Sequence, residues 1–310
     1  METYTGSMTL PRRLAVAAYL IGCLATPERA TAQAIERAMM VTVVDESGAP
    51  VQDLGVSDFI VREDNVAREV LRVTRANEPM QIALLVDTST AARDNIAHYR
   101  TALPTFVMML TNPSESGQKN QVAIIATGER PTLITDYTSS AIELQRGINR
   151  LWSRDDTGAY LLDSLLETSQ GFAKREASRP VIVAITQEGP ELSYRQYDQV
   201  LGPLRASAAA FYAMVLGTPS ASLSDEARSR NIVLDEGTRG TGGSREQLLT
   251  PMALKSKLQQ LAYLLTHQYL VTYAHPDSLI PPERVTVTAK KPGMTARGTV
   301  VKDKIQQGRR

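Results

Sequence analysis

The sequence offers little material for thiol or histidine chemistry. Its 310 residues include one cysteine, Cys23, and three histidines, His98, His267 and His275. A single cysteine cannot form an intrachain disulfide, so the fold must depend on its packed core. The histidines are far apart in the sequence, which favours packed or solvated positions over a metal site or a shared catalytic role.

Neither sign of charge dominates, and two enzyme motifs are missing. The chain has 34 basic and 33 acidic residues, so nothing indicates a surface for nucleic acid. There is no G-x-S-x-G turn, which marks one large class of serine hydrolases. The glycine cluster GTRGTGG (237–243) lacks the Gly-Lys-Ser/Thr ending of a phosphate loop, and we expect it to end a helix and form a turn.

The N-terminal apolar run is too short to span a membrane. LAVAAYLIGCLA (14–25) has twelve residues, whereas a spanning helix needs about 20. It follows two arginines and precedes the small-residue site Ala30-Thr31-Ala32, a pattern typical of a secretory signal peptide. We therefore expect residues 1–32 to be removed and the protein to be periplasmic or secreted. The alternative is a lipobox at Leu20-Ile21-Gly22-Cys23, which would give a membrane-anchored lipoprotein acylated on Cys23.

Two β-rich zones flank a long zone of a different pattern. Residues 38–80 alternate apolar and polar side chains, with turn pairs at Ser47-Gly48 and Asp64-Asn65. Alternation returns at 267–302, before a tail at 303–310. We predict that these two segments pair into one small antiparallel β-sandwich.

The zone from 81 to 266 predicts a doubly wound α/β domain with a mostly parallel sheet. Short continuous apolar runs of this kind are typical of strands buried on both faces. They lie at 82–86, 122–126, 181–185 and 210–216. The helix candidates between and after them lie at 92–111, 139–153, 159–175, 193–207 and 251–266.

Several groups of residues follow one another in an order that resembles the pattern of one protein family. The N-terminal zone contributes Asp45, Gly48, Pro50-Val51, Leu54, Asp58-Phe59 and Glu63-Asp64; the central zone contributes Asp87-Thr88-Ser89, Leu234 and Thr241-Gly242-Gly243; the C-terminal zone contributes Leu261, Gln268-Tyr269, Tyr273, Arg284–Val287, Pro292-Gly293 and Arg297-Gly298. Together they resemble the exported "VWFA-related domain" proteins of acidobacterial type, which have the von Willebrand factor type A fold. The resemblance covers nearly all of the chain after residue 32.

The resemblance implies a metal-ion-dependent adhesion site at the carboxyl ends of the strands. The family builds it from Asp-x-Ser-x-Ser in a first loop, a threonine in a second and an aspartate in a third. Asp87 and Ser89 match the first two positions, but Ala91 replaces the last serine. Oxygen ligands and negative charge are what Mg²⁺ requires, so this loss weakens the site.

The second and third loops depart further from the family. Ala159 stands at the threonine position, with Thr157 two residues too early. Gln187 replaces the aspartate, and Glu188 could reach the site only after a change of register. Two of five oxygen positions remain, so we expect no bound metal. Asp87 and Ser89 would then hydrogen-bond exposed loop amides at the top of the sheet.

These observations predict a non-catalytic protein-interaction module with a degenerate adhesion site. Its partner would be a protein of the envelope or extracellular space. The expected binding rim contains Asp87, Ser89, Thr90, Thr157, Gln187 and Glu188. One alternative is a genuine Mg²⁺- or Mn²⁺-dependent adhesin in which Thr90, Thr157 and Glu188 replace the missing ligands. Two others are a hydrolase that uses Asp87 or Ser89, and a structural role in an envelope complex.

Overall fold

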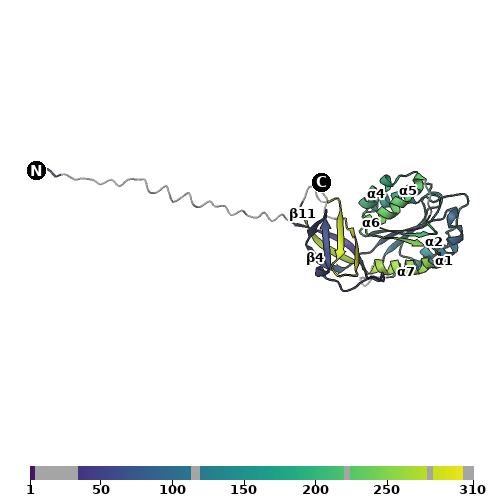
Figure 1. Ribbon diagram of the computed structural model, residues 1–310, viewed down its shortest axis with the longest axis horizontal. Helices are drawn as coiled ribbons and strands as arrows, with labels where there is room; N and C mark the ends of the chain where they lie inside the picture. The colour runs from purple at the N-terminus through teal and green to yellow at the C-terminus, as the bar shows by residue number, and fades with distance from the viewer. Residues whose placement is uncertain (4–33, 113–118, 220–223, 278–281, 303–310) are drawn as a thin grey trace.

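The computed structural model describes residues 1–3, 34–112, 119–219, 224–277 and 282–302. The proposed signal peptide (apart from its first three residues), the lipobox and the tail at 303–310 lie outside these residues. Figure 1 shows a β-sandwich beside a larger α/β body. None of the helices in the described ranges combines the length and the apolar character needed to span a bilayer.

The α/β body is built on a six-stranded sheet. In spatial order its strands are β10 (Arg245–Leu248), β9 (Ala210–Leu216), β8 (Pro180–Gln187), β5 (Gln81–Val86), β6 (Gln121–Ala126) and β7 (Thr132–Thr138). All neighbours are parallel except β6 and β7. The predicted mostly parallel sheet is confirmed, and the four predicted strands are its centre. The two edge strands, β7 and β10, were not predicted.

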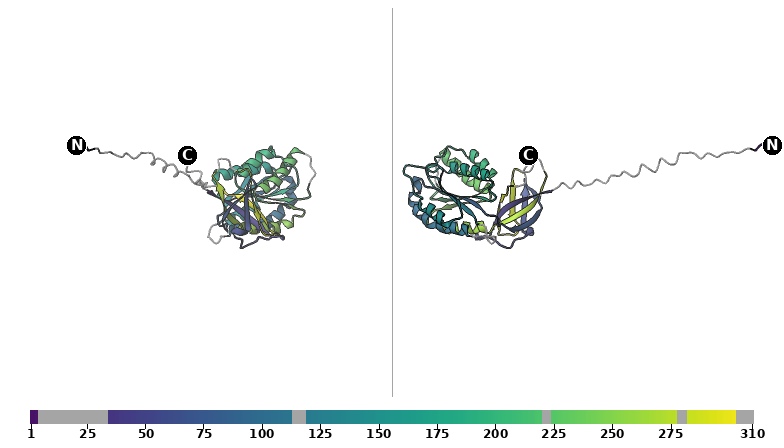
Figure 2. Two further views of the ribbon diagram at one scale, coloured as in Figure 1. Left: turned by 60° about the vertical axis from the view of Figure 1, so that its left-hand side comes forward. Right: turned by 180° about the vertical axis from the view of Figure 1, so that it is seen from behind.

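Helices cover both faces of the sheet, as a doubly wound fold requires. One face packs against α1 (Ile96–Thr111), α2 (Ala141–Asn149) and α7 (Ala253–Thr266); the other packs against α3 (Leu161–Arg175), α4 (Tyr197–Ala206) and the π-helical segment η3 (Val233–Gly237). Alternate residues of β5 reach opposite cores: Ile82 and Leu84 one, Ala83 and Leu85 the other. Figures 1 and 2 show these layers from three directions.

One helical stretch was not among the helix candidates, although a helix was expected to end within 237–243. It comprises α5 (Asp225–Ile232), η3 and the short α6 (Thr238–Gly240). Only Ser229 and Arg230 of α5 are buried, so the helix has no apolar stripe to reveal it. The stretch ends in a turn at Gly242, whose φ of +76° is left-handed. The predicted helix end and turn within 237–243 is therefore confirmed.

The flanking segments form two antiparallel sheets that share a core. One sheet has the order β13 (Thr295–Val300), β1 (Ala34–Val44), β11 (Tyr269–Pro276) and β4 (Val70–Arg75), and the other has β12 (Val285–Ala289), β2 (Phe59–Glu63) and β3 (Val66–Arg68). The predicted sandwich of N- and C-terminal segments is confirmed. Asp64 and Asn65 both have positive φ, as a two-residue hairpin between β2 and β3 requires.

The sandwich meets the α/β body at the amino-terminal edge of the parallel sheet. There the buried Arg179 donates to the carbonyl oxygens of Ala76, Glu78 and Leu265 and to Oε1 of Gln268, at 2.7–3.3 Å. These four acceptors lie on the two segments that join the bodies. The opposite, carboxyl edge of the sheet faces away from the sandwich (Figure 1). Short 3-10 helices, η1 (Val56–Asp58) and η2 (Thr90–Asn95), complete the elements.

Candidate functional site

Asp87 lies at the carboxyl end of β5, next to the point where the strand order reverses. Its carboxylate is buried, and it accepts hydrogen bonds from the main-chain N–H of Ser89 at 2.9 Å and of Gln187 at 3.0 Å. Burial raises the pKa of Asp87, while these bonds, the Ser89 side chain and the charge of Arg230 oppose the increase. Asp87 therefore joins the first and third loops through amides that are buried rather than exposed.

Thr90 and Thr157 contact each other rather than Asp87. Thr90 Oγ1 accepts from the N–H of Thr157 at 3.0 Å and donates to the carbonyl oxygen of Arg154 at 3.1 Å. Thr157 Oγ1 donates to the same carbonyl at 3.3 Å. The turn after β6 also passes close to the first loop, because a Cβ on Gly128 would lie 2.4 Å from the carbonyl carbon of Thr88. The two threonines thus fasten the first and second loops together.

The side chain of Gln187 points toward the start of α1. Its Oε1 accepts from Asn95 Nδ2 at 2.9 Å, and its Nε2 donates to the hydroxyl of Tyr99. Burial raises the pKa of that hydroxyl well above its usual value. At the position where the family pattern has an aspartate, this chain therefore has a neutral side chain, and its oxygen and nitrogen both already form hydrogen bonds.

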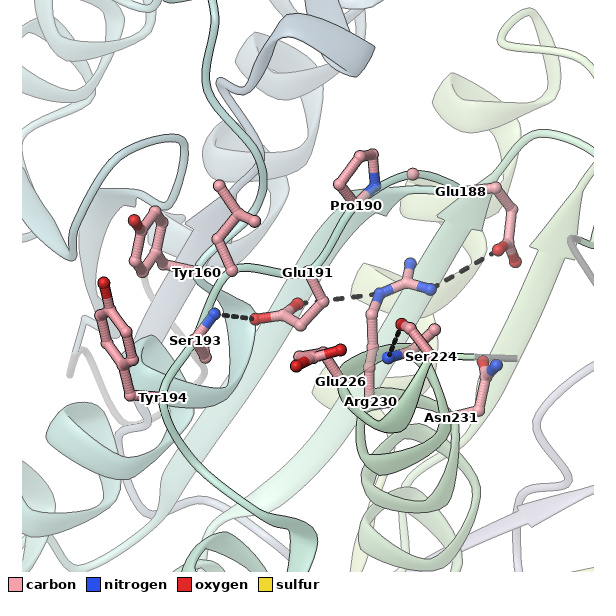
Figure 3. Close-up of a pocket in the computed structure, with 13 residues that line it drawn as sticks. Tyr160, Glu188, Pro190, Glu191, Ser193, Tyr194, Ser224, Glu226, Arg230 and Asn231 are labelled. Carbon is pink, nitrogen blue, oxygen red and sulfur yellow. Dashed lines mark hydrogen bonds and ion pairs between the residues drawn. The ribbon is translucent and has the colours of Figure 1, made fainter. Parts of the chain in front are cut away.

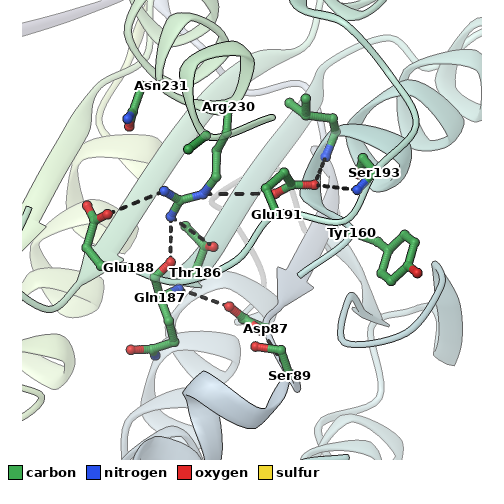
Figure 4. Close-up of polar contacts among 12 residues, drawn as sticks. Asp87, Ser89, Tyr160, Thr186, Gln187, Glu188, Glu191, Ser193, Arg230 and Asn231 are labelled. Atoms are coloured by element: carbon green, nitrogen blue, oxygen red, sulfur yellow. Dashed lines mark hydrogen bonds and ion pairs between the residues drawn. The ribbon is translucent and has the colours of Figure 1, made fainter. Parts of the chain in front are cut away.

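Glu188 turns to the other side of the third loop. Its carboxylate forms ion pairs with Arg230 at 3.5 Å and with Arg245 at 3.7 Å, and it accepts from Gln247 Nε2 at 3.3 Å. Figure 4 shows Glu188 directed to Arg230 and away from the Asp87–Ser89 pair. The structure thus brings Asp87, Ser89 and Gln187 together, and places Glu188 in a separate cluster.

The oxygens around Asp87 do not fit a hard divalent cation. Such an ion needs about six oxygen ligands and favours several negative charges. Here Asp87 supplies one charge, and both of its oxygens already accept main-chain hydrogen bonds. Ala91 supplies no oxygen, and Gln187 and Glu188 are directed elsewhere. Among the described residues, no three His, Cys, Asp or Glu side chains are grouped to hold a metal.

The sequence analysis missed the polar cluster centred on Arg230. This arginine extends inward from α5 and is only 2% exposed. Its Nη2 donates to the carbonyl oxygen of Gln187 at 2.6 Å, and its Nε lies 4.0 Å from Oε2 of Glu191. Burial raises the pKa of Glu191 to about 7, while Ser193, Arg230 and the amide of Leu162 oppose the increase. Two glutamates closely following a buried strand were the available signal, because buried carboxylates need a cationic or hydrogen-bonding partner.

A cavity of about 690 Å³ lies beside this cluster. It opens between the third loop and α5, and Figure 3 shows Glu191 and Arg230 at its centre with Tyr160 and Tyr194 on one side. Glu188 and Glu226 are also among the residues that line it. The cavity therefore combines aromatic side chains with three carboxyl groups and one guanidinium.

Large apolar side chains are exposed around the carboxyl edge. They are Trp152, Leu192, Tyr194, Leu249 and Met252, with exposures from 43% to 89%. The guanidinium of Arg154 lies 4.9 Å from the centre of the Trp152 ring. Exposed aromatic and apolar side chains that gather on one face are typical of interaction surfaces.

No protein-family model and no curated protein matches the chain. Solved structures do resemble it. A von Willebrand factor type A protein from Catenulispora acidiphila has a TM-score of 0.48 and 10% identity, with 86% of this chain and 72% of that one covered. The SpRpn10 VWA domain has a TM-score of 0.45 and 12% identity, with 59% and 95% covered.

A protein of the mussel byssus, proximal thread matrix protein 1, is also similar. Its TM-score is 0.47 and its identity 16%, and 66% of this chain is covered. The match spans 49% of the mussel protein, about half its length. That protein has also been solved with zinc in its MIDAS motif. Several of these neighbours are von Willebrand factor type A domains, but similarity at this level assigns neither a family nor a function.

Proposed function

We propose that this chain is an exported, non-catalytic module that binds a protein partner at the carboxyl edge of its parallel sheet, without a metal ion. The partner would be a protein of the envelope or extracellular space. The main support is a contrast within this edge. Asp87, Glu191 and Arg230 are buried and held by hydrogen bonds or an ion pair, whereas Trp152 and Tyr194 are 57% and 89% exposed. Trp and Tyr supply much of the binding energy in many protein interfaces.

The polar groups of the edge support binding rather than catalysis. Ser89 lies beside Asp87, but no described histidine is hydrogen-bonded to Ser89, as a general base would be. His267 lies at the end of α7, near the sandwich, and His275 pairs with Glu63 inside the sandwich. A serine without an adjacent base is a weak nucleophile. Export is supported by the N-terminal sequence pattern.

The donor set around Asp87 supports metal-independent binding. In an adhesin that depends on Mg²⁺ or Mn²⁺, the partner's carboxylate would complete the coordination of the ion. With Asp87 already bonded to two amides, this chain would instead bind through its apolar side chains. We therefore expect partner binding to persist in a chelator.

Affinity capture from envelope extracts in EDTA tests the proposal. The baits are the wild-type protein, a Trp152→Ser/Tyr194→Ser variant, and a matched Val66→Ser/Leu71→Ser variant that changes exposed apolar residues of the sandwich. We expect one set of partners to be captured by the wild type and the sandwich variant and lost with the edge variant. Capture that requires Mg²⁺, or that survives the edge substitutions, would contradict the proposal.

A further inference from the structure

The resemblance seen in the sequence implies a cation site at the carboxyl edge, but the residues around Asp87 do not fit a metal. A positive charge is nevertheless present in the fold, on Arg230. We infer that the Arg230 guanidinium is a built-in cation that holds the third loop, residues 186–191, in the place of a bound ion. This inference concerns the binding face proposed above, and its test needs no knowledge of the partner.

The contacts of Arg230 converge on one short segment. Nη2 donates to the carbonyl oxygen of Gln187 at 2.6 Å and to Oγ1 of Thr186 at 3.4 Å. Nη1 lies 3.5 Å from Oε2 of Glu188, and Nε lies 4.0 Å from Oε2 of Glu191. A neutral carbonyl, a hydroxyl and two carboxylates of the same loop thus surround one cation, as oxygen ligands surround a bound ion.

The main chain of Gln187 connects this cation to the aspartate of the degenerate site. Its N–H donates to Asp87 at 3.0 Å, and its carbonyl oxygen accepts from Arg230 at 2.6 Å. Figure 4 shows the resulting chain of contacts from Asp87 through Gln187 to Arg230. The charge of Arg230 also favours the ionised form of Asp87. The same charge would repel a cation at Asp87, so one residue both orders the loop and disfavours a metal.

The contact with Glu191 is ionic rather than a hydrogen bond. Neither Arg230 Nε nor Glu191 Oε2 has a hydrogen-bond partner among the described residues, although both atoms are buried. The interaction of Arg230 with the glutamates therefore depends mainly on its charge. A cation of different shape in the same place should retain much of it, whereas a neutral group of similar shape should not.

Helix α5 provides a matched control for this role. Ser224 caps the helix by accepting from the N–H of Ala227 at 3.2 Å, and Arg230 faces inward while Arg228 is exposed. Replacement of Arg228 changes the charge and composition of the same helix without affecting the third loop. Any general effect of losing an arginine from α5 should appear in both variants.

Chemical rescue of Arg230→Ala in the full chain tests the inference. The readouts are the melting temperature and the hydrogen exchange of amides 187–194, each measured with 20 mM guanidinium chloride, 20 mM urea or 20 mM NaCl. Because the buried Glu191 loses its cation and Glu188 keeps only Arg245, we expect the melting temperature to fall by about 10 °C. Guanidinium should restore at least half of this loss and slow the exchange of the loop, whereas urea and NaCl should do neither. Arg228→Ala should melt within about 1 °C of the wild type.

A charge-matched pair keeps the test decisive if Arg230→Ala does not fold. Arg230→Lys retains the charge, and Arg230→Gln removes it. We expect Arg230→Lys to melt several degrees above Arg230→Gln and to protect amides 187–194 better. Equal melting and equal protection in these two variants, or equal rescue of Arg230→Ala by urea, would overturn the inference. None of these readouts involves the partner. A failure of the capture experiment with the Trp152 and Tyr194 variant would therefore contradict the proposed function without affecting this inference.

Discussion

The two edges of the parallel sheet each contain a buried arginine, but the two arginines have different surroundings. At the amino edge, Arg179 donates only to neutral acceptors, three main-chain carbonyls and the Gln268 side chain. At the carboxyl edge, Arg230 lies between Glu188 and Glu191. Burial lowers the pKa of Arg179 to about 10, so it remains charged at neutral pH.

The difference corresponds to what each edge does. Arg179 connects the two segments that join the sandwich to the α/β body, and strong bonds to several carbonyls suit a permanent junction. Arg230 acts within one loop, next to an open cavity and exposed apolar side chains. A pair of opposite charges there would keep the proposed binding loop in shape and leave its outer surface free.

The largest expected effect is at the amino edge. Arg179→Met would leave three carbonyl oxygens and one amide oxygen without their donor in a buried place. We expect the free energy of unfolding to fall by about 4 kcal/mol. Urea unfolding followed by circular dichroism measures it, with the exposed Arg175→Met as control. A loss below 1 kcal/mol would show that the junction does not depend on Arg179.

Removal of the carboxylate at the carboxyl edge should have a somewhat smaller effect. Asp87→Ala leaves the buried N–H groups of Ser89 and Gln187 without acceptors, which costs about 3 kcal/mol. Asp136→Ala, which removes an exposed partner of Arg175, is the control and should change stability by less than about 0.5 kcal/mol. Urea unfolding of both variants gives the comparison. Equal stabilities would mean that the amides of Ser89 and Gln187 do not depend on Asp87.

Glu191 should make the stability of the protein depend on pH. The pKa of Glu191 is about 7 in the folded protein, against 4.5 as its ordinary value. Between these values the folded state binds more protons, so the contribution of Glu191 to stability decreases as pH rises from about 4.5 to 7. Glu191→Gln removes this contribution, and its stability relative to the wild type should rise by about 3 kcal/mol between pH 4.5 and 8. Unfolding at a series of pH values measures this; a constant difference would show that Glu191 does not titrate in this range.

Added metal ions should have the smallest effect on the protein. Calorimetric titration of Mg²⁺ and Mn²⁺ into the wild type should give no saturable heat, and 5 mM of either ion should shift melting by less than about 1 °C. Asp87→Ala is the control and should respond in the same way. Saturable binding that Asp87→Ala abolishes would instead support a cation-dependent adhesin.

Most of the fold could be predicted because the central strands are buried on both faces. The four short, continuous apolar runs are typical of such strands, and Asp64-Asn65 supplies the residue types of a tight hairpin. The edge strands β7 and β10 were missed because TLITDYT and REQL are mixed in polarity, as expected where only one neighbour and one buried face are present. Helix α5 was missed because its buried residues are a serine and an arginine.

The candidate site was predictable only in part. The position of Asp87 follows from the end of an apolar strand, since this alone places it at the carboxyl edge of the sheet. The direction of a side chain after a strand depends on its partners, so the turn of Glu188 toward Arg230 could not be read from adjacent residues. Arg230 itself lies 42 positions from Glu188 on a polar helix, where an arginine is usually solvated. Only the fold brings the two together.

The pairing of β1 with β11 has a consequence for the order of folding. Thr42, on β1, accepts a hydrogen bond from Gln268, 226 positions along the chain. A contact so distant is improbable in an unstructured chain, because closing a long loop costs conformational entropy. Once the α/β body has formed, its strand β5 begins and its helix α7 ends near Arg179, so the two halves of the sandwich are already neighbours. The α/β body would therefore serve as a template on which the sandwich assembles.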